Sequence, residues 1–124
     1  MTPLPVASTT PQVFLFAGAS PYENNLNSCW LLSGAGDIQL DFTSMDIEAE
    51  AYCGFDYVEV YRGNDPELTD RVTQRLCGNE SISIPNSSFS QSTVAPDYIR
   101  FLIIRFHSDD SVAGKGFALQ YTLV

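Results

Sequence analysis

Glu48 and Asp56 are eight positions apart in an acidic stretch of the chain. On one extended strand, at about 3.3 Å per residue, they would lie roughly 26 Å apart and could not share a ligand. Carboxylate oxygens bind calcium at about 2.3–2.6 Å, so the two side chains can cooperate only if residues 49–55 fold back as a loop. Gly54 permits such a turn, and a disulfide at Cys53 would hold it. We therefore expect a site for a hard cation here.

The residue types favour calcium over other cations at this site. Magnesium demands a tight octahedral set of ligands and gives up its water reluctantly. Zinc prefers imidazole and thiolate ligands, and the chain has a single histidine and cysteines that are better explained by a disulfide. Converging carboxylates would repel one another without a cation. The alternative is that these acids are ordinary surface carboxylates.

Two catalytic interpretations are disfavoured. His107, Ser108 and Asp109 have the composition of a hydrolase triad, but neighbours along one strand or turn point to different faces, and the chain has no Gly-x-Ser-x-Gly motif. Glu48 and Asp56 could be the acid pair of a glycosidase, but a domain this small shows no sign of a deep cleft. We therefore expect that this protein is not an enzyme.

Charge limits the choice of partners. The 124 residues have a formal net charge of −9, and ten of the fifteen carboxylates lie between Asp37 and Asp70. Such a surface repels nucleic acid and anionic lipid, and it suits basic partners or metal cations. For most of these ten acids, a solvated acidic face is the alternative interpretation. No run approaches the roughly 18 apolar residues of a membrane span, so no membrane insertion is expected.

The elements around the acidic stretch are expected to be short strands. Apolar and polar residues alternate over 38–43, which predicts a strand with one face in the core. The run 98–106 is almost continuously apolar and predicts a central strand covered on both faces. Further strands are expected at 13–16, 29–32, 57–61, 75–77, 81–84 and 117–124, with a helical turn at 66–72. Many short strands separated by turns indicate an all-β sandwich.

A chain of this length is expected to form a single domain with one core. Residues 1–12 lack the basic and apolar regions of a signal peptide, and their Pro, Ser and Thr content predicts a flexible tail or linker. The sandwich is then expected to occupy 13–124. The leading Met fits a module cut from a larger secreted protein.

Cysteines and sequons indicate an oxidising, secretory environment. Cys29, Cys53 and Cys77 are odd in number, so one pair is expected to bond and one thiol to be left over. Asn79 and Asn86 each begin an Asn-x-Ser sequon and are candidate glycosylation sites.

Seven short motifs, in order, resemble those of a CUB domain. They are Cys29-Trp30, Ile38-x-Leu40-x-Phe42, Ile47-Glu48, Cys53-Gly54-Phe55-Asp56-Tyr57-Val58-Glu59-Val60, Leu76-Cys77-Gly78, Phe106-His107-Ser108-Asp109 and Gly116-Phe117. The resemblance covers residues 14–124. It implies a jelly-roll-like sandwich of two antiparallel sheets, found in extracellular proteins, that serves as an interaction module.

The resemblance to the calcium-binding members of this family also implies a ligand set. Glu48, Asp56 and Asp109 would hold one Ca²⁺ ion, and Tyr22 would support the site. The residues after Asp109 would add backbone or side-chain oxygens, here Asp110, Ser111 and Val112. Some members have an Asn where Val112 stands, so Val112 would have to contribute its carbonyl oxygen or a water.

The cysteines match the family only in part. Cys53 and Cys77 correspond to its second disulfide. The usual cysteine N-terminal to Cys29 is missing, so Cys29 is expected to be a free, buried thiol near Trp30, unless it pairs with a cysteine outside this chain.

These expectations together predict an extracellular module, either secreted or part of an ectodomain. Ca²⁺ would order the loops at 48–56 and 108–112, and Tyr22, Glu48, Asp56 and Asp109 would present the site to an exposed Lys of a protein partner. Two alternatives remain open at this stage, a carbohydrate-binding module and a substrate-docking appendage of a secreted protease.

Overall fold

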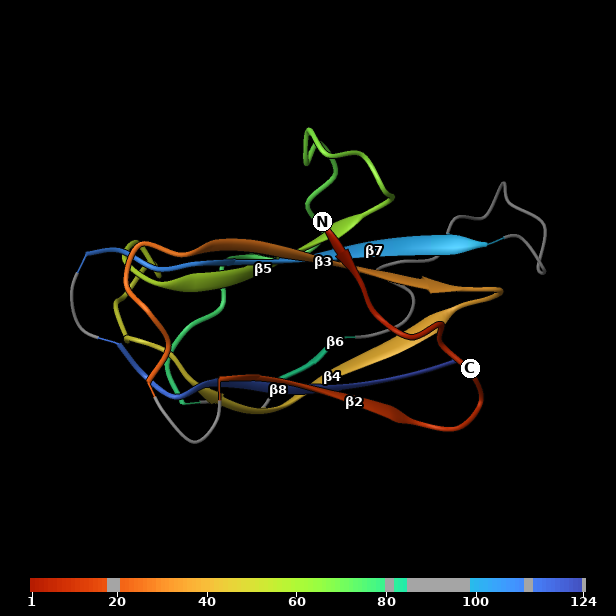
Figure 1. Ribbon diagram of the computed structural model, residues 1–124, viewed down its shortest axis with the longest axis horizontal. Coiled ribbons are helices and arrows are strands. Elements are labelled where there is room, and N and C mark those ends of the chain that lie inside the picture. Colours follow the sequence, from red (N-terminus) through yellow and green to blue (C-terminus); the bar gives the residue numbers. More distant parts are fainter. Residues whose placement is uncertain (18–20, 80–81, 85–98, 111–112, 124) are drawn as a thin grey trace.

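A computed structural model of the chain describes residues 1–17, 21–79, 82–84, 99–110 and 113–123. Strands in these residues form two four-stranded sheets that lie face to face as two layers (Figure 1). The first sheet has the order β1-β3-β7-β5, and its strands are β1 (Thr2–Pro3), β3 (Asn27–Gly34), β7 (Arg100–His107) and β5 (Tyr57–Arg62). The second has the order β2-β8-β4-β6, and its strands are β2 (Gln12–Ala17), β8 (Gly116–Leu123), β4 (Ile38–Asp46) and β6 (Ile82–Ile84).

The core lies between the two sheets and confirms the predicted all-β sandwich. Along β4, Ile38, Leu40 and Phe42 are each at most 1% exposed, as their alternation with polar residues predicts. The apolar run of β7 occupies an inner position, paired antiparallel with β3 on one side and β5 on the other. Aromatic rings from both sheets meet in this core, where Phe16 and Phe117 contact each other and each contacts both Trp30 and Phe106.

The N-terminal segment differs from the flexible tail expected at residues 1–12. β1 runs parallel to β3, and the amides of Leu4 and Ala7 donate to the carbonyl oxygens of Leu31 and Ser33, each at 2.8 Å. Ala7 is only 4% exposed. The partners of this segment lie on distant strands and include backbone carbonyl oxygens of β3, which the local composition could not reveal.

Tyr121→Phe is expected to loosen this N-terminal segment. The Tyr121 hydroxyl donates to the carbonyl oxygen of Pro5 at 2.7 Å, and its loss should lower the free energy of unfolding by about 1 kcal/mol. Urea denaturation measures the loss. Amide hydrogen exchange should also become faster at Leu4 and Ala7, and unchanged exchange at both would count against the anchoring.

The structure also differs from the expected elements at 66–72 and 75–77 and from the expected burial of Cys29. Residues 75–77 form no strand, and Leu76 makes an isolated bridge with Val58. Residues 66–72 contain a turn at 66–67 and a bridge of Arg71 with Tyr61, but no helix. Cys29 is unpaired but only half-buried, so the expectation of a buried thiol near Trp30 is wrong. Alternate side chains of a strand face opposite sides, and the inward position belongs to Trp30. Among the described residues, no helix has the length and apolar character needed to cross a bilayer.

Candidate metal centre

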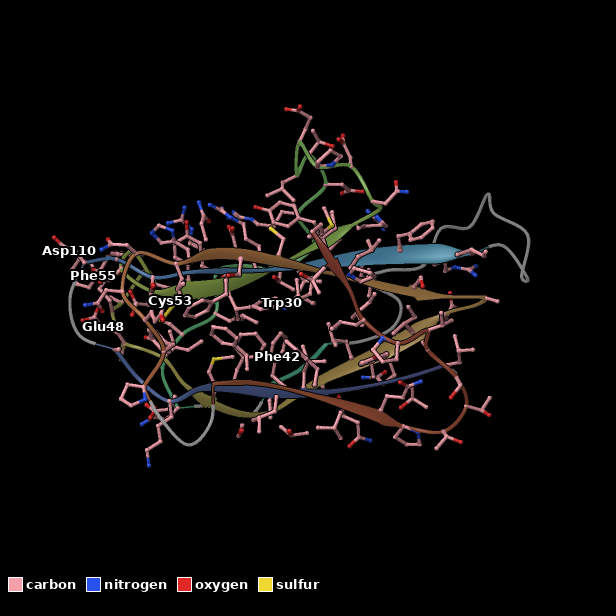
Figure 2. The ribbon with its side chains drawn as sticks, in the orientation of Figure 1. Trp30, Phe42, Glu48, Cys53, Phe55 and Asp110 are labelled. Atoms are coloured by element: carbon pink, nitrogen blue, oxygen red, sulfur yellow. A yellow bond between two sulfur atoms is a disulfide. The ribbon has the colours of Figure 1, made fainter. Side chains whose placement is uncertain are left out.

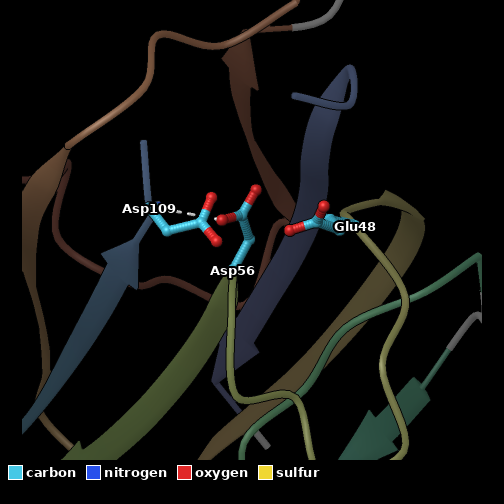
Figure 3. Close-up of side chains that lie close together, drawn as sticks. All are labelled: Glu48, Asp56 and Asp109. Carbon is cyan, nitrogen blue, oxygen red and sulfur yellow. Dashed lines mark hydrogen bonds between the residues drawn. The ribbon is translucent and has the colours of Figure 1, made fainter. Parts of the chain in front are cut away.

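Three carboxylates from distant parts of the chain meet beside one another. One oxygen each of Glu48, Asp56 and Asp109 lies within 4.8 Å of the others. Figure 3 shows Asp56 between Asp109 and Glu48, and Figure 2 places Glu48 at one end of the sandwich with Phe55 and Asp110. Residues 49–55 therefore fold back as a loop, which the eight-residue spacing required.

The position of Glu48 is fixed by the end of β4 and by the loop after it. Ile47 exchanges two backbone hydrogen bonds with Gly78, at 3.2 and 3.0 Å. The Cys53–Cys77 disulfide, implied by the family resemblance, is present and ties this loop to the same segment. Together these contacts hold both ends of the loop against residues 76–78.

Glu50 organises the loop from within, a role that the sequence analysis missed. Its carboxylate accepts hydrogen bonds from the amides of Tyr52, at 3.0 Å, and Gly54, at 2.7 Å. An acid two to four positions before such amides could have signalled this local turn. Glu50 is not among the three converging carboxylates.

Asp56 lies at the centre of the site and is fully buried. Its Oδ2 accepts a hydrogen bond from the Tyr22 hydroxyl at 2.5 Å, and its Oδ1 accepts one from the Asp109 amide at 2.8 Å. The Tyr22 hydroxyl also accepts from the Glu48 amide at 3.3 Å, so this one side chain links two of the acids. Tyr22 packs edge-on against Phe106 in the core, which fixes its ring.

Asp109 follows β7 in a loop whose backbone is held on both sides. The Asn25 amide donates to the Asp109 carbonyl oxygen at 2.7 Å. The Ser108 hydroxyl donates to the Glu23 carbonyl oxygen and accepts from the Leu26 amide, both at 2.8 Å. The Ser108 hydroxyl therefore has a structural role, which agrees with the rejection of a catalytic triad.

His107 points to a different environment from Asp109. Its ring stacks on Tyr57 with centroids 4.9 Å apart. It is therefore not oriented by the neighbouring acid as a triad histidine would be.

Gly114 allows the loop after Asp109 to lie against the end of β4. A Cβ atom there would collide with the carbonyl oxygen of Asp46. The Gly114 carbonyl oxygen accepts from the Tyr22 amide at 3.0 Å, and the Asp46 carboxylate accepts from the Lys115 amide at 3.1 Å. The close approach therefore positions Tyr22 as well.

The other predicted site residues have different placements. Asp110 is exposed next to Asp109 and is not one of the three converging carboxylates. Ser111, Val112 and Asn86 lie outside the described residues. Asn79 is exposed.

The electrostatics of the site favour a positive ligand. Burial, and then the charges of Asp109 and Asp56, raise the pKa of Glu48. One Glu48 oxygen is buried and has no hydrogen-bond partner among the described residues. Burial also raises the pKa of Asp56 in spite of the hydrogen bonds from Tyr22 and Asp109. An unpartnered buried carboxylate is costly, and a bound cation would remove that cost.

The metal-free domain is expected to lose stability through these acids as pH rises above about 4. The pKa values of Asp56 and Glu48 rise on folding from 3.8 and 4.5. An acid with a raised folded-state pKa stabilises fully below its unfolded pKa, and this contribution is lost as pH rises through the folded value.

Urea denaturation in chelator, at several pH values, measures this effect as the difference between the wild type and Glu48→Gln. The wild type should become progressively less stable relative to the variant as pH rises. A difference that does not change with pH would show that Glu48 is not perturbed.

Comparison with known proteins gives consistent matches. The CUB domain family model matches residues 6–121. Mouse Tolloid-like protein 1 is 35% identical over 106 residues, which cover 84% of this chain and 9% of that protein. The chain therefore spans only a small part of this relative.

Two solved structures share the fold at 19% identity. The MASP-1 CUB2 domain bound to Ca²⁺ superposes with a TM-score of 0.65 and covers 94% of this chain and 96% of that one. The full extracellular region of zebrafish Gpr126/Adgrg6 gives a TM-score of 0.61 and covers 94% of this chain and 14% of that one.

Proposed function

The chain belongs to the CUB domain family, whose members are non-catalytic protein–protein interaction modules, and on that premise we propose that it is an extracellular module that binds one Ca²⁺ ion and presents the site to a lysine of a protein partner. The observation that carries the proposal is the convergence of Glu48, Asp56 and Asp109, with a buried Glu48 oxygen that has no partner among the described residues.

The donor set suits calcium. Ca²⁺ takes six to eight oxygen ligands with flexible geometry, and three carboxylates supply both charge and oxygens. Each Asp56 oxygen accepts one hydrogen bond and retains a lone pair for a cation. Asp110, Ser111 and Val112 are proposed to complete the coordination from the adjoining loop. The Ca²⁺-bound neighbour shares the fold, and it supports calcium as the first ion to test.

The bound ion would make the site a receptor for an ammonium group. With calcium holding the three carboxylates in place, their remaining oxygens can accept charge-assisted hydrogen bonds from a lysine of the partner. Phe55 is 50% exposed at the same end of the sandwich and offers an apolar surface for the lysine stem (Figure 2). One such contact is worth roughly 1.5–3 kcal/mol, so a tight complex would need a wider interface or several modules.

Capped lysine amide is a direct probe of this function, with capped norleucine as its uncharged match. NMR titration of the calcium-loaded domain should show lysine binding at roughly tens of millimolar, shifting signals of residues 48–56 and 108–110. The shifts should vanish in chelator and in Glu48→Gln. Equal shifts with norleucine, or with lysine in chelator, would contradict the proposal. Sugar-specific glycan binding that survives Glu48→Gln would favour the carbohydrate alternative instead.

A further inference from the structure

A second charged cluster lies on the outer face of the first sheet, away from the core. Glu59 on β5 is only 1% exposed. Its carboxylate is approached by the guanidinium groups of Arg71 at 2.7 Å, Arg105 at 3.0 Å and Arg75 at 3.6 Å, and by the Tyr61 hydroxyl at 2.9 Å. Three of the six basic side chains of an acidic protein therefore gather around one carboxylate.

The cluster has more positive charge than Glu59 can balance. Arg71, Arg105 and Tyr61 already hydrogen-bond to the two Glu59 oxygens. Arg75 lies beyond hydrogen-bond distance of Glu59, and its side chain is 40% exposed. The charge of Glu59 is therefore already balanced by Arg71 and Arg105, and Arg75 is not needed to neutralise it.

Arg75 is nevertheless held in a defined position. Its guanidinium carbon lies 4.0 Å from the centre of the Tyr57 ring, and that ring is fixed by stacking on His107. An aromatic ring attracts the positive charge without occupying the N–H donors in the way that a carboxylate would. The Nε of Arg75 faces Glu59 at 3.6 Å, and its Nη donors thus remain available to a ligand at little cost in side-chain ordering.

Arg75 also borders a surface hollow of about 420 Å³, which we call the arginine hollow. The lining residues are Ala51, Tyr52, Cys53, Arg71, Gln74 and Arg75. Two of these residues are well exposed: 46% of the Arg71 side chain and 87% of Tyr52 are accessible to solvent. The hollow is lined by two guanidinium groups, a side-chain amide and a tyrosine, whose N–H and O–H groups can donate hydrogen bonds to a carboxylate.

We propose that the arginine hollow binds an acidic side chain of a protein partner, at a site separate from the three converging carboxylates and independent of calcium. A carboxylate pairs with the planar donors of Arg75 and Arg71. Exposed Tyr and Arg are also the residues that contribute most to protein–protein interfaces. A sulfated glycan chain is less suited, because the surrounding surface of a protein with net charge −9 would repel a polyanion that extends beyond the hollow.

The test is an NMR titration of the arginine Nε–Hε signals with capped Gly-Glu-Gly peptide, and with capped Gly-Gln-Gly as the uncharged match. The signal of Arg75 should shift only with the Glu peptide, equally in calcium and in chelator, with an affinity of roughly tens of millimolar. Arg75→Gln should weaken binding about tenfold, and it leaves Glu59 paired with Arg71 and Arg105. Arg62→Gln, at the exposed ion pair with Asp70, is the matched control and should bind as the wild type does.

Three results would overturn the proposal. They are equal shifts with both peptides, no shift with either peptide, and binding of a sulfated disaccharide in place of the Glu peptide. Because the titration is also run in chelator, its failure would not affect the proposed calcium and lysine site.

Discussion

The double substitution Cys53→Ala/Cys77→Ala is expected to lower the free energy of unfolding by about 3–4 kcal/mol. The disulfide joins residues 24 positions apart, and its loss lets the unfolded chain explore more conformations. It also ties the loop after Glu48 to residues 76–78, so the variant should bind calcium more weakly than the wild type. A loss of this size is a large share of the stability of a domain.

Urea denaturation measures the stability, and Cys29→Ala is the matched control. Cys29 is unpaired and half-buried, so its substitution removes a thiol without opening a disulfide. We expect a cost below about 1 kcal/mol for the control. If the double variant were no less stable than the control, the disulfide would have no role in holding the loop.

Glu59→Gln is expected to destabilise the domain by about 1.5–3 kcal/mol at neutral pH. The glutamine nearly preserves the shape of the side chain but takes the anion away from the guanidinium groups of Arg71 and Arg105, which hydrogen-bond to it. The cost stays below that of a fully buried ion pair because 46% of the Arg71 side chain and 22% of the Arg105 side chain are exposed to water. Asp70→Asn, at the exposed pair with Arg62, is the matched control and should cost less than about 1 kcal/mol.

The pH dependence gives a second measure of the same cluster. Burial alone would raise the pKa of Glu59, but the hydrogen bonds from Arg71 and Tyr61 and the charge of Arg105 outweigh it and lower the pKa below 4.5. Its stabilising contribution is therefore complete above that value and is lost as pH falls through the folded pKa. The stability difference between wild type and Glu59→Gln should shrink as pH falls from about 5 to 3, and a growing difference would contradict the assignment.

The sequence allowed the sandwich and the core of the site to be predicted for physical reasons. The alternation in β4 and the apolar run of β7 reflect which faces are buried, and this information is local. The spacing of Glu48 and Asp56 required a loop. Asp109 could be added only through the family resemblance, because it lies far away in the chain.

Other features depend on contacts that no local pattern carries. The anchoring of residues 2–8 depends on backbone groups of β3 and β8 and on the Tyr121 hydroxyl. The half-exposure of Cys29 depends on which face of β3 turns inward. The gathering of Arg71, Arg75 and Arg105 at Glu59 joins side chains from separate segments of the chain. Such contacts become visible only when the fold is assembled.

A calorimetric Ca²⁺ titration of the chelator-stripped domain at neutral pH, with Asp109→Ala as the comparison variant, decides whether Glu48, Asp56 and Asp109 form a calcium site. We expect a single site with a dissociation constant of about 1 mM or tighter, a higher melting temperature with calcium, and the loss of both in the variant. No heat and no gain in melting temperature for the wild type would show that the three carboxylates do not form a calcium site.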